Sequence, residues 1–189
     1  MQIILASSSP RRKELLTKLG YVFSVVDSGF KEKEFTNDPV ETAIAFAKGK
    51  AETVYRSLMN KDKKIVLGAD TVVFHEDKIL GKAKDDMHAR LLLKSLSGKT
   101  HVVITGYAVV CNGKTTVGYS QSKVSFNVLT EALIDAYVSS GLYKGKAGAY
   151  GIQDGFGLVK NCEGSIDNVI GLPTEEIDLI LSNILNGNK

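Results

Sequence analysis

Apolar and polar residues alternate along this chain in stretches that predict strands and helices in turn. An apolar run over residues 3–6 is typical of a strand. Ser9 and Pro10 follow it and predict a helix start, because serine caps a first turn and proline fits its first position. Leucines then recur on one helix face until Gly20 ends the helix. The chain is therefore expected to open with a strand, a loop and a helix.

Helical spacing recurs in four later segments. Asp38 and Glu41 resemble a capping box at the start of a second helix. Thr130 and Thr174 are candidate N-caps of two later helices. The expected helices cover residues 38–58, 85–97 and 130–141 and the segment that begins at Thr174.

Strands are expected on both sides of the third helix. Before that helix, an apolar stretch over residues 65–74 is interrupted at Gly68-Ala69-Asp70, and the polar residues 75–78 should turn the chain back. Two later runs are joined by Asn112-Gly113, the dipeptide that most favours a two-residue hairpin turn. The expected strands cover residues 65–67, 71–74, 100–111 and 115–129. Strands that alternate with helices predict the α/β class.

Length and composition fit one domain. The chain has 189 residues, and its 43% of hydrophobic residues suffices for the core of a single domain over 1–189, which can be pinched into two lobes. No apolar run approaches the roughly 20 residues that cross a bilayer, and the first residues lack the basic-then-apolar order of a signal peptide. We therefore expect a cytoplasmic protein with no membrane partner.

Charge and cysteine content exclude other classes. A net charge of +3, with scattered lysines, is too weak for a phosphate-backbone surface, so no nucleic-acid partner is expected. Cys111 and Cys162 lie far apart and form no C-x-x-C pair, so neither zinc binding nor redox work is expected. Both are expected to be ordinary buried thiols.

The first helix start carries a candidate phosphate site. Arg11 and Arg12 stand where the helix dipole favours negative charge, which makes physical sense if an anion binds there. Backbone N–H groups, the hydroxyls of residues 7–9 and the guanidinium groups would then form a phosphate cradle. The alternative is a capped surface helix with solvated arginines.

Asp70 is the second candidate. It lies in the apolar context IVLGADTVVF, where a carboxylate must be desolvated, partnered or functional. The alternative is an aspartate that caps a turn at a strand end. Lys82 follows the expected turn and could return toward Asp70 and a bound phosphate. A carboxylate, a lysine and a metal ion form a familiar phosphate-handling set.

A glycine-rich segment over residues 145–157 is the third candidate. Its glycines would let a ligand approach the backbone closely. Gln153 offers both a donor and an acceptor, which suits a base edge. The segment fits neither the Walker pattern nor G-x-G-x-x-G, and the alternative is a flexible surface loop.

Two hydrolase classes are excluded by pattern. His75-Glu76 lacks the second histidine of H-E-x-x-H, and no serine lies in G-x-S-x-G. His88, His101 and Thr105 remain second-rank site candidates, with a polar helix or sheet face as the alternative.

Taken together, five motifs resemble the Maf family, in order and over nearly the whole chain. They are S-x-S-P-R-R at 7–12, G-A-D-T at 68–71, G-K at 81–82, K-A-G-A-Y-G-I-Q at 146–153 and N-V-I-G-L-P at 168–173. The resemblance implies an α/β fold with a mixed twisted sheet flanked by helices and two lobes around a cleft, similar to inosine triphosphate pyrophosphatases. It also implies a homodimer and the hydrolysis of a nucleoside triphosphate to monophosphate and pyrophosphate, with Mg²⁺ or Mn²⁺ as cofactor.

The resemblance also implies residue roles. The aspartate matching Asp70 acts as proton acceptor, and Glu32 joins it as a metal ligand, with Glu34 close enough to be a rival. The residues implied to hold the phosphates are Ser8, Arg12, Lys50 and Lys82.

Three positions match the dTTP/UTP branch of the family: Arg11, Thr71 and Gln153. The sister branch, which acts on 7-methyl-GTP, tends to carry tryptophan, glutamine and glutamate there. A glutamate suits a cationic methylated guanine, whereas neutral Gln153 can pair with the imide edge of uracil or thymine. The expected substrates are dTTP and UTP, with modified pyrimidine nucleotides open, and the expected role is cleaning of the nucleotide pool.

The alternatives are a 7-methyl-GTP pyrophosphatase and a nucleotide-binding regulator. The regulator is suggested by the family's association with septum formation. A pure binder has no need of a carboxylate beside a phosphate cradle, because that charge repels the ligand unless a metal intervenes. Nucleotide binding without hydrolysis would favour the regulator.

Overall fold

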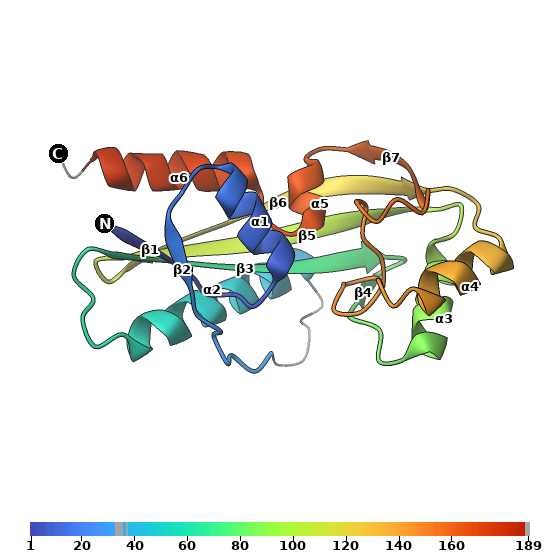
Figure 1. Cartoon of the computed structure of the whole chain (residues 1–189), viewed down its shortest axis with the longest axis horizontal. Helices are drawn as coiled ribbons and strands as arrows, with labels where there is room; N and C mark the ends of the chain where they lie inside the picture. Colours follow the sequence, from blue (N-terminus) through green and yellow to red (C-terminus); the bar gives the residue numbers. More distant parts are fainter. Residues whose placement is uncertain (33–35, 37, 188–189) are drawn as a thin grey trace. The chain divides into compact units, whose positions relative to one another are not determined.

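The computed structural model describes residues 1–32, 36 and 38–187. Seven strands form one mixed sheet in the order β2-β1-β3-β5-β6-β7, with β4 paired to β3, and helices flank it (Figure 1). The strands are β1 (Gln2–Leu5), β2 (Phe23–Val25), β3 (Lys64–His75), β4 (Lys78–Leu80), β5 (Thr100–Cys111), β6 (Lys114–Phe126) and β7 (Val159–Glu163). The helices are α1 (Pro10–Lys18), α2 (Pro39–Ser57), α3 (Asp86–Leu96), α4 (Glu131–Ser139), α5 (Ile166–Ile170) and α6 (Thr174–Asn186). The expected α/β class is confirmed.

Two compact units divide the chain. Unit 1 comprises Met1–Asp70, Thr105–Ser120 and Gly171–Lys189, and unit 2 comprises Thr71–Ile104 and Gln121–Ile170. The long strands β3, β5 and β6 contribute residues to both units.

In unit 1, strand β1 runs parallel to both of its neighbours. Ile3 lies opposite Phe23 of β2 on one side and Ile65 of β3 on the other. Figure 1 shows α2 on one face of these strands and α1 and α6 on the opposite face. Covering both faces explains the continuous apolar runs of β1 and β3, because parallel strands of this kind have no solvent side.

Helix α2 approaches the sheet unusually closely in unit 1. A Cβ added at Gly68 of β3 would lie 2.4 Å from the carbonyl oxygen of Ala47, and one added at Gly106 of β5 would lie 2.3 Å from the carbonyl carbon of Ala43. Real Cβ atoms do not approach backbone this closely. The two glycines therefore let the helix backbone rest directly on the strands, with Ala51 in the same contact.

Unit 2 has its own apolar core. Helices α3 and α4 contact each other, and their apolar faces join the inward side chains of the strands and of the glycine-rich segment. The largest fully buried side chains in this core are Tyr137, Leu93, Leu96 and Ile134.

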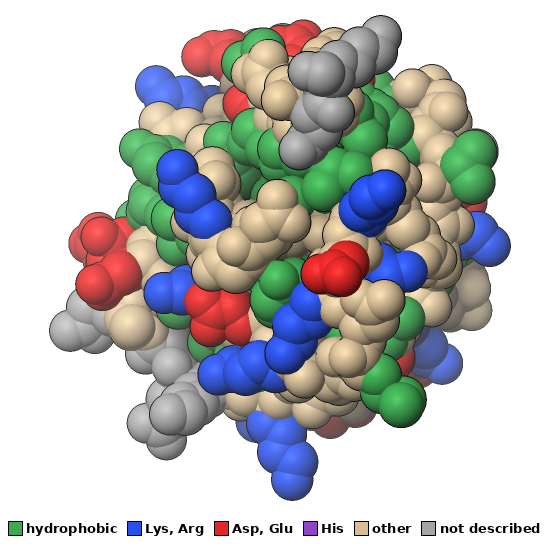
Figure 2. All heavy atoms as spheres, turned by 90° about the vertical axis from the view of Figure 1, so that its left-hand side faces the viewer, with side chains coloured by type: hydrophobic (Ala, Val, Ile, Leu, Met, Phe, Trp, Pro, Cys, Tyr) green, Lys and Arg blue, Asp and Glu red, His purple; other side chains and the backbone are tan. Residues whose placement is uncertain are grey.

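Surface charge is mixed in sign on the face that Figure 2 draws. Basic side chains there are interspersed with acidic and apolar ones. This agrees with the weak net charge of +3. Among the helices of the described residues, none combines the length and the apolar character that spanning a bilayer requires.

The capping signals were read correctly at α2 and α4, and α3 begins where it was expected, with a cap that the sequence reasoning did not assign. Asp38 accepts hydrogen bonds from the amides of Val40 and Glu41, at 2.7 and 3.3 Å, and Thr130 accepts from Leu133 at 3.2 Å. Asp85 accepts from the amide of His88 at 2.7 Å and starts α3. The hairpin prediction is also confirmed, because β5 pairs with β6 and both Asn112 and Gly113 have positive φ, as the two-residue turn requires.

Several boundaries were wrong. The expected break at Gly68-Ala69-Asp70 does not occur, and β3 runs through it because Gly68 serves a helix contact rather than a turn. Pro173 is the N-cap of α6, so Thr174 is its first helical residue. Strand β6 ends at Phe126, earlier than expected.

Four short elements, each three to five residues long, were not predicted: β2, β4, β7 and α5. Cys111 and Cys162 are free thiols but only half-buried.

Substituting Gly68 by alanine tests the helix contact. We expect Gly68→Ala to lower the free energy of unfolding by about 1–3 kcal/mol, because the new methyl group must push α2 away from β3. Urea unfolding followed by circular dichroism measures this. Ala45→Ser, which adds one atom at an exposed position of α2, should change it by less than about 0.5 kcal/mol. Equal stability of both variants would refute the close contact.

Candidate active site

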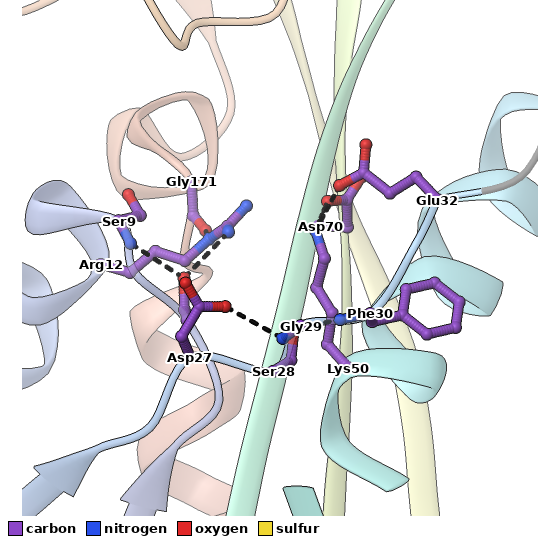
Figure 3. Close-up of polar contacts among 11 residues, drawn as sticks. Ser9, Arg12, Asp27, Ser28, Gly29, Phe30, Glu32, Lys50, Asp70 and Gly171 are labelled. Atoms are coloured by element: carbon purple, nitrogen blue, oxygen red, sulfur yellow. Dashed lines mark hydrogen bonds and ion pairs between the residues drawn. The ribbon is translucent and has the colours of Figure 1, made fainter. Parts of the chain in front are cut away.

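A lysine joins two carboxylates at the centre of unit 1. Lys50 of α2 donates from Nζ to Asp70 of β3, and also to Glu32 Oε1 at 2.7 Å. Figure 3 shows Lys50 pointing from the helix toward Asp70, with the Glu32 carboxylate beside it. The Lys50 and Asp70 side chains are only 11% and 10% exposed, whereas Glu32 is 34% exposed. Two carboxylates thus converge on one ammonium group.

The loop before Glu32 is shaped by local hydrogen bonds. Asp27 Oδ1 accepts from the amide of Gly29 at 3.0 Å, and Ser28 Oγ accepts from the amide of Phe30 at 3.3 Å (Figure 3). Such side-chain-to-backbone bonds two residues apart define tight turns. They direct the chain toward the helix that carries Lys50.

Phe30 then packs the loop onto α2. A Cβ added at Gly49 would lie 2.3 Å from Cζ of the Phe30 ring, so the ring rests directly on the helix backbone next to Lys50. The ring also packs against Phe46, with a centroid distance of 6.3 Å. This contact explains why Glu32, two residues after Phe30, reaches the lysine.

Arg12 of α1 is held in place by polar contacts of its own. Its Nε donates to the carbonyl oxygen of Gly171 at 2.8 Å (Figure 3). Its Nη1 donates to Ser7 Oγ at 3.3 Å. Ser7 Oγ also accepts from the amide of Ser9 at 3.2 Å. Burial lowers the pKa of Arg12, and nearby Asp70 opposes that shift. The guanidinium group is thus fixed and within electrostatic reach of the carboxylate.

The N-terminus of α1 has the features of an anion site. Ser9 is the N-cap by position, yet no side-chain capping bond forms among the described residues and no acidic residue lies in the first turn. Ser8 is exposed at this point and Arg11 is half-buried. Helix N-termini present amide groups and a positive dipole end to a bound anion. The phosphate cradle at this helix start stays a prediction.

Of the residues predicted to bind metal, Glu32 and Asp70 are brought together, whereas Glu34 lies outside the described residues. The described part of the chain has no group of three or more His, Cys, Asp or Glu that could hold an ion. Mg²⁺ is usually held by one or two carboxylates together with substrate phosphates and water. Two converging carboxylates fit that mode.

Three predicted site residues belong to unit 2. Thr71 follows Asp70 directly on β3 and is half-buried. Lys82 is exposed and forms an isolated antiparallel bridge with Ala147. Gln153 is exposed in the glycine-rich segment. Their roles toward a ligand, and the return of Lys82 toward Asp70, stay predictions.

The second-rank candidates have structural surroundings. His101 is buried, with Nε2 2.7 Å from Tyr150 Oη. Burial lowers the pKa of His101 to about 4, so its ring is neutral at pH 7. Thr105 is also buried, and His88 Nδ1 accepts from the amide of Lys84 at 3.3 Å. His101 and Thr105 are thus buried polar groups rather than members of an exposed polar sheet face, and His88 contacts the backbone just before α3.

Sequence reasoning missed four residues that build the site. Ser7 and Gly171 hold Arg12, whereas the sequence reasoning expected the Ser7 hydroxyl to face a phosphate and gave the motif of Gly171 no role. Gly171 has a φ of 130°, which favours glycine. Gly49 and Gly68 permit the contacts that bring Glu32, Lys50 and Asp70 together. A single glycine in a helix or strand is the only sequence signal that could have suggested this.

The fold and this cluster define an α/β protein whose buried aspartate is paired with a lysine, in a unit that also holds a fixed arginine at the start of α1. Comparison with known proteins makes the assignment more specific. Residues 2–184 match the family model described as "Maf: Maf-like protein", and the chain belongs to the Maf family.

Curated relatives cover almost the full chain. The chain is 43% identical over 190 residues to a dTTP/UTP pyrophosphatase of Pyrococcus furiosus, covering 100% of this chain and 96% of the relative. It is 42% identical over 191 residues to a protein of the same name from Aquifex aeolicus, covering 99% and 98%. It is also similar to the solved structure of the Staphylococcus aureus Ham1 protein, with a TM-score of 0.45 and 15% identity over 67% of this chain and 72% of that one.

Removing the lysine tests the charge cluster. Lys50→Met should lower the free energy of unfolding by about 3–5 kcal/mol, because it leaves the Asp70 carboxylate in a buried site without its cation. Adding Asp70→Asn to that variant should recover part of the loss, since the more deeply buried of the two carboxylates is then replaced by a neutral amide. Urea unfolding of the two single variants and the double variant gives the coupling free energy. The control Lys48→Met removes an exposed lysine of the same helix, and a loss as large as that of Lys50→Met would contradict the pairing.

Proposed function

We propose that this chain is a nucleoside triphosphate pyrophosphatase that acts on dTTP and UTP. The observation that carries the proposal is the Glu32–Lys50–Asp70 cluster, which lies in the same unit as the Arg12 site and the open start of α1. The names of the relatives that match nearly the full chain support the same activity. Its proposed setting is the cytoplasm, where it would remove unwanted nucleotides from the pool.

Phosphate binding is assigned to the cations of unit 1 together with the start of α1. Arg12 is pre-oriented by Gly171 and Ser7, so little side-chain freedom is lost when a phosphate binds. An ammonium group has three donors, and Lys50 directs two toward Glu32 and Asp70. A phosphate oxygen is a suitable acceptor for the third. Ser8 and the α1 amides would complete the cradle, and Lys82 is proposed as a further phosphate ligand.

Glu32 and Asp70 are the proposed holders of a divalent cation, Mg²⁺ or Mn²⁺. When bound, such an ion neutralises phosphate charge and lowers the pKa of coordinated water. The support for this proposal is that the two carboxylates converge on one ammonium group and lie close enough to share an ion.

Asp70 is the proposed base. Its carboxylate accepts a proton from the attacking water as the water oxygen forms a bond to the α-phosphorus. The bond between the α-phosphorus and the bridging oxygen to the β-phosphorus breaks, and pyrophosphate leaves with that oxygen. Arg12 and Lys50 would stabilise the negative charge that develops on the phosphate oxygens. The products are a nucleoside monophosphate and pyrophosphate.

Base recognition is assigned to Arg11, Thr71 and Gln153. A neutral amide that donates and accepts can pair with the imide edge of uracil or thymine. A panel of dTTP, UTP, CTP, 7-methyl-GTP and ITP, with pyrophosphate release as the readout, tests this. Preference for dTTP and UTP supports the assignment, whereas preference for 7-methyl-GTP or ITP would replace the substrate and keep the enzyme.

Replacing the proposed base gives the main mutational test. Asp70→Asn should reduce the rate of pyrophosphate release by about 10²–10⁴-fold, the usual contribution of a general base, while circular dichroism shows an intact fold. Asp62→Asn, at an exposed site of unit 1, should retain full activity. Undiminished turnover in Asp70→Asn would rule out Asp70 as the base. Nucleotide binding without turnover in the unaltered chain would favour the regulator instead.

Metal removal gives an independent test. Treatment with a chelator should abolish pyrophosphate release, and added Mg²⁺ or Mn²⁺ should restore it, because the two carboxylates require a cation to accept a triphosphate beside them. Glu32→Gln should raise the metal concentration needed for half-maximal activity. Full activity in the chelator would argue against the assigned metal ligands.

A further inference from the structure

Unit 2 buries an ion pair that the proposed mechanism does not use. Lys146 Nζ is paired with Asp154 Oδ2, and the two side chains are only 8% and 7% exposed. Tyr137 of α4, itself fully buried, donates from Oη to the same carboxylate oxygen at 2.5 Å. Buried ion pairs lose their hydration and often stabilise a fold no better than apolar side chains would. A role in fixing local geometry explains this one better than stability does.

The same groups fix the backbone of the glycine-rich segment. Tyr137 Oη also accepts from the amide of Gly151 at 3.1 Å, and the amide of Asp154 donates to the carbonyl oxygen of Gly151 at 3.2 Å. A Cβ added at Gly151 would lie 2.7 Å from the carboxylate oxygens and from Lys146 Nζ. The charged pair therefore packs directly on this backbone.

Aromatic packing holds the far side of the segment. The Tyr137 ring meets the Phe156 ring edge to face, with a centroid distance of 5.1 Å and an interplanar angle of 77°. Residues on both sides of positions 152–153 are thus attached to one tyrosine of α4.

Gln153 is the exposed side chain between these attachments. It follows Gly151 by two residues and directly precedes Asp154. Because its neighbours are held through hydrogen bonds and the ion pair, the backbone at Gln153 has few orientations available. A side chain that projects from a fixed backbone loses less entropy when it pairs with a base, and it discriminates better between similar bases.

We propose that Tyr137, Lys146 and Asp154 are positioning residues that orient Gln153 for recognition of a uracil or thymine base. This inference rests on the proposed function, because it assumes that Gln153 contacts the base. It adds three side chains that act on substrate choice without touching the substrate.

Tyr137→Phe is the most conservative test, because it removes only the hydroxyl group. We expect kcat/KM for UTP to fall about tenfold, mainly through KM, with the preference for UTP over CTP reduced by a similar factor. Tyr119→Phe, at an exposed tyrosine, should match the unaltered chain. If the unaltered chain shows no preference for UTP over CTP, the proposed assignment of Gln153 to base recognition fails. If it prefers UTP and Tyr137→Phe keeps that preference, the positioning inference alone is overturned.

Hydrogen exchange tests the backbone claim without any activity. Peptides that cover residues 145–157 should exchange faster in Tyr137→Phe than in Tyr119→Phe, whereas peptides of unit 1 should not differ. Unchanged exchange in that segment overturns the inference.

The ion pair is tested with Asp154→Asn and Lys146→Met, against Lys144→Met at an exposed lysine of the same segment. Both substitutions should lower the preference for UTP over CTP and speed hydrogen exchange in residues 145–157. The control should change neither. A fall in kcat shared equally by UTP and CTP would indicate a merely structural role and overturn the inference.

Discussion

Helix α2 lies so close to strands β3 and β5 that no side chain fits at two positions between them. Gly68 and Gly106 permit this contact, and the alanines of α2 complete it. The contact sets the distance between the helix and the strand that carries Asp70, and Lys50 extends from that helix to the carboxylate. With a bulkier residue at position 68, α2 would move outward and a lysine of fixed length would lose its partner. The charge cluster of unit 1 therefore depends on a backbone contact.

That cluster combines charges that would be unfavourable alone. Asp70 is buried in an apolar strand, which penalises its charged form unless a cation is near. Lys50 provides the cation, and the Phe30 contact with Gly49 brings Glu32 to the same ammonium group. Two carboxylates beside fixed cations would suit the proposed divalent ion and the proposed phosphate chain together, because each would offset the charge of the other. A phosphate-binding function follows from this balance more directly than from any one residue.

Sequence reasoning predicted the large elements and missed the contacts that build the site. Helices with caps, such as the one at Asp38, were predicted because a cap is a local signal. Asp70 was predicted because a charge in an apolar run is visible in the sequence. The close approach of α2 to β3 was not predicted, since a glycine in a strand suggests a turn or bulge as readily as a helix contact. Gly171 accepts a hydrogen bond from Arg12 across 159 residues of chain, and no local pattern predicts that pairing.

The two buried lysine–aspartate pairs of this chain illustrate why a motif does not define a role. Lys50 shares its ammonium group between two carboxylates, one of them partly exposed, so the group can exchange a contact for a phosphate oxygen. Lys146 and Asp154 are both enclosed, and the carboxylate also accepts from a buried tyrosine hydroxyl. The first pair has unbalanced charge and access to solvent, which suits binding and proton transfer. The second is balanced and closed, which suits holding a backbone. The same two residue types thus serve opposite purposes according to their neighbours.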